Sequence, residues 1–283
     1  MTKTRFEQIA RRILPPILLD ALQGLSERWS RQPAEWARAP ADAFPKDSTV
    51  NGWNVESVIA EQLRKWDRLV DLTSGTGPLG IEPHAPELSS SDYRAHNIMV
   101  TFGYVLALTA REKDSISILD WGSGPGQYYV FGRALLPEVE LDYHGVDVPL
   151  ICEGGRQVVP EATFHDDEGS AFDRTYDLVV TSGSLQYIED WRTKVDRLVK
   201  AAESYLYVVT PVVRHAEPFV IVQRPHKYGY MTEFTQWVFN RDQLVQHVES
   251  SGMRLRREFL NEEMGPIRGT PERRATMGFL FER

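Results

Sequence analysis

The chain has 283 residues, of which 42% are hydrophobic and 25% charged, as expected for a folded globular protein. Its net charge of −8 opposes a general electrostatic grip on nucleic acid, so we expect no nucleic-acid partner. The single cysteine, Cys152, excludes an internal disulfide framework and favours a reducing compartment such as the cytoplasm.

The N-terminal segment 1–31 is basic in an otherwise acidic chain, and it contains the apolar run "ILPPILL". A basic amphipathic start can rest on an anionic membrane surface, which would make the protein peripheral at the inner membrane. The alternative is a helix packed on the protein itself or on a second subunit of a homodimer. The sequence shows no secretion signal and no apolar run long enough to cross a bilayer, so we expect a cytoplasmic protein.

Two regions are predicted along the chain. Residues 1–90 are expected to form a helical or irregular extension that serves as a lid, a dimer element or a membrane-surface element. Within it, the prolines of 31–53 indicate a linker or an irregular segment that wraps around the protein, 55–72 has helical spacing, and 74–91 has the composition of a loop. Residues 91–283 are expected to form the main domain, which opens with a helix capped by Ser91 or Asp92.

Strand and helix patterns alternate from residue 115 onward. Strands are predicted at 115–121, 139–148, 161–167, 176–184 and 204–213, with helices between them. This alternation indicates βαβ units and a mainly parallel sheet. An irregular stretch is expected at 214–239. A helix follows that begins at Asn240 and stops at Gly252, and two strands end the chain.

A glycine-rich turn, "ILDWGSGPG", joins the first of these strands to the next helix. Its glycines allow a sharp turn and a close approach of ligand to the backbone. The dinucleotide fingerprint would place the third glycine one position later than Gly126. Asp120 would also repel a pyrophosphate, whereas it suits the ammonium group of S-adenosylmethionine (SAM). We therefore favour SAM as the ligand.

The following strand ends add polar and small residues in chain order. Asp147 ends the second strand, where a carboxylate can accept both hydroxyls of a ribose. The third strand ends in "FHDD", where Asp166 or Asp167 can accept a hydrogen bond from an adenine amino group. The fourth ends in "TSGS", which leaves room for a ligand. Taken together and in this chain order, the strand-end residues indicate the ligand more specifically than any one of them does alone.

With the motifs "LDWGSGPG", "GVDVP", "FHDD" and "YDLVVTSGSLQYIEDW", residues 91–283 resemble the class I SAM-dependent methyltransferases. The resemblance implies an α/β, Rossmann-like fold with a seven-stranded, mainly parallel sheet and an antiparallel C-terminal strand. It also implies a SAM site. The resemblance places Gly122, Ser123 and Gly124 along the methionine part, with Asp120 near its amino group and Ser182 or Gly183 at its backbone. It places Asp147 at the ribose and Asp166 at the adenine. Gly126 and Val148 are the remaining residues of the expected site.

The segments "SLQYIEDW", "VVTPVV" and "VIVQRP" are also similar to a group of bacterial methyltransferases associated with polysaccharide or lipopolysaccharide assembly. Acceptor residues are expected at about 212–239, after the fifth strand. The candidates, whose rings and charges suit a sugar, are Arg214, Arg224, Tyr228, Tyr230 and Trp237. An alcohol acceptor needs a general base, for which His215 is the first candidate. A phosphate or carboxylate acceptor would need cations instead.

The leading hypothesis is a SAM-dependent O-methyltransferase that acts on a sugar or on a glycan-linked or lipid-linked intermediate. One alternative is a small-molecule methyltransferase of secondary metabolism. Two others are a nicotinamide-dependent oxidoreductase and a non-catalytic scaffold with the same fold. No residue set has the spacing of a metal site, so we expect no metal.

Overall fold

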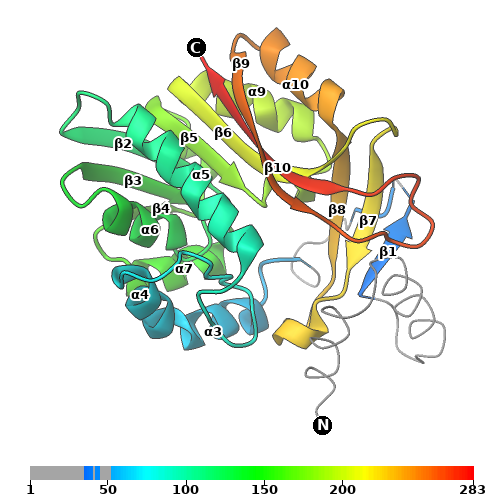
Figure 1. The fold of residues 1–283 in the computed structure, drawn as a ribbon, viewed down its shortest axis with the longest axis horizontal. Coiled ribbons are helices and arrows are strands. Elements are labelled where there is room, and N and C mark those ends of the chain that lie inside the picture. Colours follow the sequence, from blue (N-terminus) through cyan, green and yellow to red (C-terminus); the bar gives the residue numbers. More distant parts are fainter. Residues whose placement is uncertain (1–34, 41, 45–51) are drawn as a thin grey trace.

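The computed structural model describes residues 35–40, 42–44 and 52–283. In these residues ten strands form one continuous sheet, and helices lie on both of its faces (Figure 1). The strands are β1 (Trp36–Ala39), β2 (Ser115–Trp121), β3 (Glu140–Val146), β4 (Thr163–His165), β5 (Tyr176–Ser182), β6 (Ala202–Val213), β7 (Phe219–Gln223), β8 (Phe234–Asn240), β9 (Arg254–Glu263) and β10 (Ala275–Glu282). The helices are α3 (Glu56–Arg64), α4 (Trp66–Ser74), α5 (Tyr93–Thr109), α6 (Gln127–Leu135), α7 (Pro149–Val158), α8 (Glu168–Ala171), η1 (Leu185–Tyr187), α9 (Trp191–Ala201), η2 (His226–Tyr228) and α10 (Arg241–Ser250).

The main part of the sheet has the strand order β4-β3-β2-β5-β6-β10-β9. Strands β2 to β6 pair in parallel, and β10 runs antiparallel to both β6 and β9. The predicted α/β, Rossmann-like fold with an antiparallel C-terminal strand is therefore confirmed. The predicted seven strands account for this part of the sheet, whereas three further strands extend it.

The three added strands are β1, β7 and β8, and two of them come from the stretch predicted to be irregular. Strands β7 and β8 form an antiparallel pair, β1 pairs with β7, and β8 joins the end of β6 at Val212 and Val213. Pro218, Pro225 and Gly229 interrupt this stretch in the sequence and hide the alternation of buried residues along β8. The predicted linker at 31–53 likewise contributes β1.

The two faces of the main sheet are buried by different helices. Leu119 and Trp121 of β2 belong to an apolar cluster with α9 and α10, whereas Ile116 and Ile118 pack with α5 and α6. Successive side chains of a strand point to opposite faces, so one strand supplies both clusters. Burial on both faces holds the carboxyl ends of β2, β3 and β5 in fixed positions.

Two helix caps lie where the sequence predicts them, whereas one predicted helix is divided into two. The side chain of Asp92 accepts a hydrogen bond from the backbone N of Ala95 at the start of α5, and Asn240 caps α10, as predicted. The single helix predicted at 55–72 is instead two helices, α3 and α4, which are separated at Lys65. Lys65 is 5% exposed, and its ammonium donates to the carbonyl oxygens of Pro83 and Ala85 at 3.0 and 2.9 Å.

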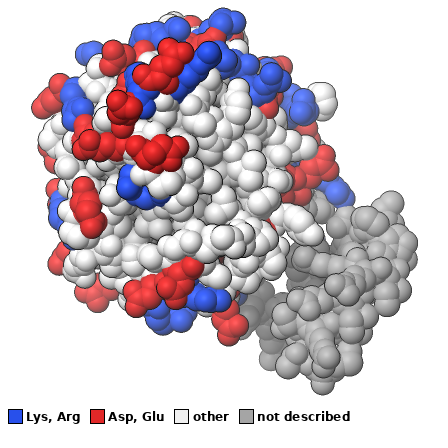
Figure 2. Space-filling model, turned by 60° about the vertical axis from the view of Figure 1, so that its left-hand side comes forward, with Lys and Arg blue, Asp and Glu red and all other residues white. Residues whose placement is uncertain are grey.

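On the face shown in Figure 2, basic and acidic side chains are interspersed around a broad uncharged area. Of the helices in the described part of the chain, none combines the length and the apolar character that a membrane span needs. The basic segment 1–31, for which a membrane or dimer role is predicted, lies outside the described residues.

Candidate active site

A cavity of about 320 Å³ lies at the carboxyl ends of β2, β3 and β5. It brings together these residues of the predicted cofactor site: Gly122, Gly124, Asp147, Val148, Asp166, Ser182 and Gly183. The other residues on its wall are Trp53, Gln62, His84, Trp121, Gln127, Val146, Pro149, Ile151, Glu168, Ser184, Tyr187 and Ile188. In an α/β sheet, this carboxyl edge is the usual place for a ligand.

The glycine-rich turn forms the floor of this cavity. Gly122, Gly124 and Gly126 all have positive φ angles of 81°, 56° and 99°, which favour glycine. A Cβ at position 122 would lie 2.0 Å from Ser184 Oγ, so no side chain fits there. The turn is held by the carbonyl oxygen of Val146, which accepts from the backbone N of Gly122 at 2.7 Å. The result is a backbone-lined cradle between two strand ends.

Asp147 is the carboxylate at the cavity wall. One of its oxygens accepts from the backbone N of Gly124 at 2.8 Å, and the other accepts from the backbone N of Val148 at 2.7 Å. Burial raises the pKa of Asp147 to about 6, although these two backbone hydrogen bonds oppose the shift. Each carboxylate oxygen has a second lone pair, so Asp147 keeps the capacity to accept two ligand hydroxyls.

Three predicted cofactor residues do not line the cavity. Asp120, which precedes the turn, is 1% exposed and accepts a hydrogen bond from Tyr143 Oη. Burial, with Asp147 nearby, raises the pKa of Asp120 to about 7. Ser123 and Gly126 belong to the turn itself: Ser123 is fully buried and donates to the carbonyl oxygen of Gly124, and Gly126 is the N-cap of α6.

Trp121 and Glu168 close one side of the cavity, next to the exposed Asp166. The indole Nε1 of Trp121 donates to Glu168 at 3.0 Å, and Glu168 also pairs with Lys194 and Arg197. Asp166 pairs with Arg156 at 3.2 Å. The described residues contain no group of three or more side chains arranged to hold a metal ion.

The residues predicted to bind the acceptor lie outside the cavity wall. The backbone N–H groups of Arg214 and His215 donate to Glu272, and both residues are exposed on the turn between β6 and β7. Arg224 pairs with Glu233 at 2.6 Å, and Trp237 Nε1 donates to the carbonyl oxygen of Glu189. Tyr228 is next to Lys227 on η2. Tyr230 is buried and lies behind the wall, where it contacts His84.

Several wall residues were not predicted from the sequence, and among them are Trp53, Gln62, His84 and Tyr187. The first three come from the segment before α5. Prolines flank His84 in "EPHAP", and the segment has the composition of a surface loop. The signal that could have found His84 is a histidine in a short turn between prolines, close in sequence to a helix whose apolar face includes Gln62.

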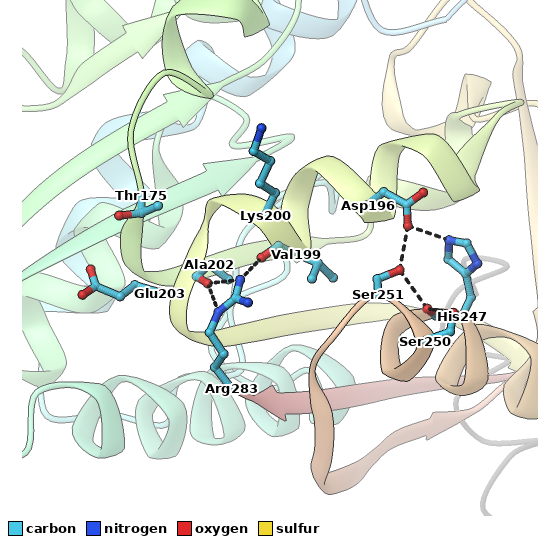
Figure 3. Close-up of a pocket in the computed structure, with 10 residues that line it drawn as sticks. All are labelled: Thr175, Asp196, Val199, Lys200, Ala202, Glu203, His247, Ser250, Ser251 and Arg283. Atoms are coloured by element: carbon cyan, nitrogen blue, oxygen red, sulfur yellow. Dashed lines mark hydrogen bonds and ion pairs between the residues drawn. The ribbon is translucent and has the colours of Figure 1, made fainter.

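A second hollow, of about 880 Å³, lies at the opposite edge of the sheet, where β5 and β6 begin (Figure 3). Some of its polar side chains bond to one another or to backbone oxygens. Arg283 donates to the carbonyl oxygens of Val199 and Ala202. Ser251 Oγ donates to Asp196 at 2.6 Å, and His247 lies 3.1 Å from the same carboxylate. Since the serine proton goes to Asp196 and not to an imidazole nitrogen, this arrangement does not activate a nucleophile. We therefore assign the chemistry to the smaller cavity.

Residues 93–258 match a family model described as a methyltransferase domain. The chain belongs to the methyltransferase domain family. This methyltransferase is therefore an enzyme that uses SAM as its methyl donor. The cavity has features that suit that donor, since no side chain fits at Gly122 and the carboxylate of Asp147 keeps lone pairs free beside its two backbone hydrogen bonds.

Solved structures that are similar to this methyltransferase have low sequence identity to it. The magnesium protoporphyrin IX methyltransferase of Synechocystis PCC 6803, with bound SAM, is 11% identical, with a TM-score of 0.47, over 81% of this chain and 97% of that chain. The 1,6-didemethyltoxoflavin-N1-methyltransferase of Burkholderia thailandensis is 13% identical, with a TM-score of 0.47, over 89% of this chain and 97% of that chain. No curated protein matches the chain.

Proposed function

We propose that this methyltransferase methylates a hydroxyl oxygen of a sugar or of a glycan-linked or lipid-linked intermediate. The observation that carries the proposal is the charge of the cavity wall. Among the described residues that form it, the charged ones are Asp147, Asp166 and Glu168, and none is Lys or Arg. A phosphate or carboxylate acceptor needs cations to hold it, whereas a neutral hydroxyl does not.

Aromatic side chains on the wall support a sugar-like acceptor. Trp53 and Tyr187 line the cavity with their ring centroids 5.3 Å apart, and Trp121 lines its other side. Rings of this kind can stack on the C–H faces of a sugar while polar groups bind its hydroxyls. The resemblance of "SLQYIEDW" and "VIVQRP" to methyltransferases associated with polysaccharide assembly points to the same acceptor class.

The chain's own contribution to the reaction is positioning, exclusion of water and removal of one proton. The bound donor supplies a methyl group on a positively charged sulfur, which transfers in line to the acceptor oxygen. Alignment of two reactants contributes roughly 7–11 kcal/mol to such a step. A neutral hydroxyl must also lose its proton. His215, the base predicted from the sequence, could do this only for an acceptor that extends from the cavity to the β6–β7 turn.

Calorimetry tests the donor part of this proposal. S-adenosylhomocysteine (SAH), the demethylated product, should bind, whereas NADH should not. Asp147→Ala should weaken SAH binding by at least about tenfold, which is the loss expected for one charged hydrogen-bonding partner. Binding of NADH in place of SAH would support the oxidoreductase alternative and overturn the proposal.

The acceptor part is tested by transfer of a tritiated methyl group. Extract from the source cells would be separated into cell-envelope and soluble-metabolite fractions, and each would be incubated with labelled SAM and the enzyme. Base-stable label in a carbohydrate-containing envelope fraction is the expected result. Label confined to small soluble metabolites would favour the secondary-metabolite alternative and overturn the sugar assignment.

We further propose that residues 1–90 act as an extension of a SAM-binding domain formed by 91–283, and that the basic segment 1–31 brings the enzyme to an anionic membrane surface. A lipid-linked acceptor would be presented there. Co-sedimentation with vesicles that contain an anionic phospholipid, and not with neutral vesicles, is expected. Equal recovery with both vesicle types would contradict the membrane role, and a dimer in sedimentation velocity would then favour a subunit contact.

A further inference from the structure

The acceptor side of the cavity is formed by residues that precede the matched family domain. Trp53, Gln62 and His84 all line the cavity, and all lie before residue 93, where the family match begins. They face the same space as Gly122 and Ser182, which come from the strand ends of the family domain. The segment 52–90 therefore adds side chains to a cavity whose other wall binds the donor.

Two of these residues present polar atoms without a partner. Gln62 is only 7% exposed and its Oε1 is enclosed, yet this oxygen accepts no hydrogen bond from the described residues. The indole Nε1 of Trp53 is likewise enclosed, and it has no acceptor in the described part of the chain. Enclosed polar atoms without partners are costly, which favours a rotation of these side chains toward the cavity, where a ligand can satisfy them. One atom needs a donor and the other an acceptor, and a hydroxyl group can be either.

His84 lies in a fixed orientation beside them. Its Nδ1 is 2.8 Å from Tyr230 Oη, and its ring packs against the ring of Trp53 at 5.8 Å between centroids. The carbonyl oxygens of Pro83 and Ala85, on either side of it, both accept from the buried ammonium of Lys65. The backbone N of His84 donates to Glu82, which pairs with Arg94. Both the ring and its backbone are therefore held in place.

The second ring nitrogen of His84 has the capacity to take a proton. In the described residues, Nε2 has no hydrogen-bond partner. When Nδ1–H donates to Tyr230, Nε2 keeps its lone pair free. Burial, together with Lys65 and Arg94, lowers the pKa of His84 against the opposing effect of Glu82. The lowered pKa favours the neutral imidazole, which is the form that a base requires.

We propose that Trp53, Gln62 and His84 form the binding site for a neutral, hydroxyl-bearing acceptor, and that His84 Nε2 removes the proton of the hydroxyl that is methylated. This proposal rests on the proposed function. As the oxygen–methyl bond forms, the methyl–sulfur bond breaks and its electron pair stays on sulfur. The hydroxyl proton moves to Nε2, and the resulting imidazolium releases it to solvent. Tyr230 is a positioning residue that sets the tautomer.

The first test compares three histidine variants in the tritiated-methyl assay on the labelled fraction. His84→Gln can still bond to Tyr230 but cannot take the proton. It should reduce turnover at least about 100-fold, the lower end of general-base catalysis, with SAH affinity unchanged within about twofold by calorimetry. His226→Gln, at an exposed position of η2, is the matched control and should leave turnover unchanged. His215→Gln tests the competing base.

Turnover of His84→Gln within about threefold of wild type would overturn the proposal, and it would do so most directly if His215→Gln lost turnover instead. If the wild type labelled nothing and did not bind SAH, the proposed function would fail and this inference with it. The two failures are therefore distinguishable. Circular dichroism and thermal unfolding of each variant would show that the fold is retained.

A second readout needs neither donor nor acceptor. Nitrogen chemical shifts of ¹⁵N-labelled histidine at pH 7.5 should show His84 neutral, with its proton on Nδ1, and Tyr230→Phe should redistribute that proton between the two nitrogens. A charged ring, or a proton on Nε2 in the wild type, would contradict the role of base.

Gln62→Met should raise the KM for the labelled acceptor about tenfold without weakening SAH binding, and an unchanged KM would remove Gln62 from the acceptor site.

Discussion

The two sides of the cavity are made in different ways. The donor side uses backbone: positive-φ glycines, N–H groups that hold Asp147, and small residues at the end of β5. The acceptor side uses side chains, namely Trp53, Gln62 and His84, which come from another part of the chain and are supported by the buried Lys65 and Tyr230. The donor side is set by a local turn, whereas the acceptor side depends on long-range packing.

This difference predicts that substitutions on the two sides of the cavity impair different steps of the reaction. Damage to the glycine turn should abolish donor binding whatever the acceptor is. Damage to the segment 52–90 should leave donor binding intact and abolish methyl transfer. A variant on one side that impaired both binding steps equally would show that the comparison is wrong.

The largest effect is expected from Gly122→Ala. The new Cβ would lie 2.0 Å from Ser184 Oγ, at a φ of 81° that non-glycine residues occupy at a cost of about 1–2 kcal/mol. Overpacking adds about 1–3 kcal/mol. We expect SAH affinity to fall at least about 100-fold by calorimetry. Gly265→Ala is the control, because its φ is not positive and no atom lies within 4 Å of the added Cβ. Similar SAH affinity of the two variants would contradict the model of a tight cradle.

Lys65→Met should have an intermediate effect and should separate the two sides. It leaves the carbonyl oxygens of Pro83 and Ala85 without their donor, so the free energy of unfolding in urea should fall by about 1–3 kcal/mol. Methyl transfer should be lost while SAH affinity stays within about twofold. Arg64→Met, at the exposed neighbouring position, should change stability by less than about 0.5 kcal/mol. Retained transfer in Lys65→Met would show that the ammonium does not position His84.

The smallest effect is the pH dependence of SAH binding. Burial raises the pKa of Asp147 to about 6, and ribose hydroxyls donate to the ionised carboxylate. As the pH falls below about 6, the carboxylate becomes protonated, so SAH affinity should fall by up to about tenfold per pH unit. Asp147→Asn should bind SAH more weakly, and its affinity should change less between pH 5 and pH 7 than that of the wild type. A wild-type affinity that is constant from pH 8 to pH 5 would remove Asp147 from the ribose site.

The sequence was sufficient for the main sheet, and it singled out seven residues that the structure places on the cavity. Each strand from β2 to β5 ends at the point where its polar or small residue appears. Residues at these strand ends in the sequence therefore lie together at the carboxyl edge of the sheet. Gly122, Asp147 and Ser182 were found in this way, and the structure places all three on the cavity. The role of Asp120 as a direct ligand remains a prediction, because Asp120 is buried and does not line the cavity.

The acceptor wall could not be predicted because no linear pattern connects its parts. Lys65 is read as one more polar residue of a long helix, yet it is buried at the boundary between α3 and α4, and its ammonium bonds to the carbonyl oxygens on either side of His84. The β7–β8 pair reads as a loop because prolines and a glycine interrupt it. Tyr230 was singled out as an acceptor ligand, whereas the structure shows it buried behind His84.

Strand β6 is longer than its parallel neighbour. Its pairing with β5 ends at Val209, and the chain then continues to Val213, where it joins β8. The strand thus belongs to both parts of the sheet, because its earlier residues pair with β5 and its last residues anchor the β1–β7–β8 extension. Insertions or deletions beyond Val213 can therefore alter this extension without shifting the register of β6 against β5.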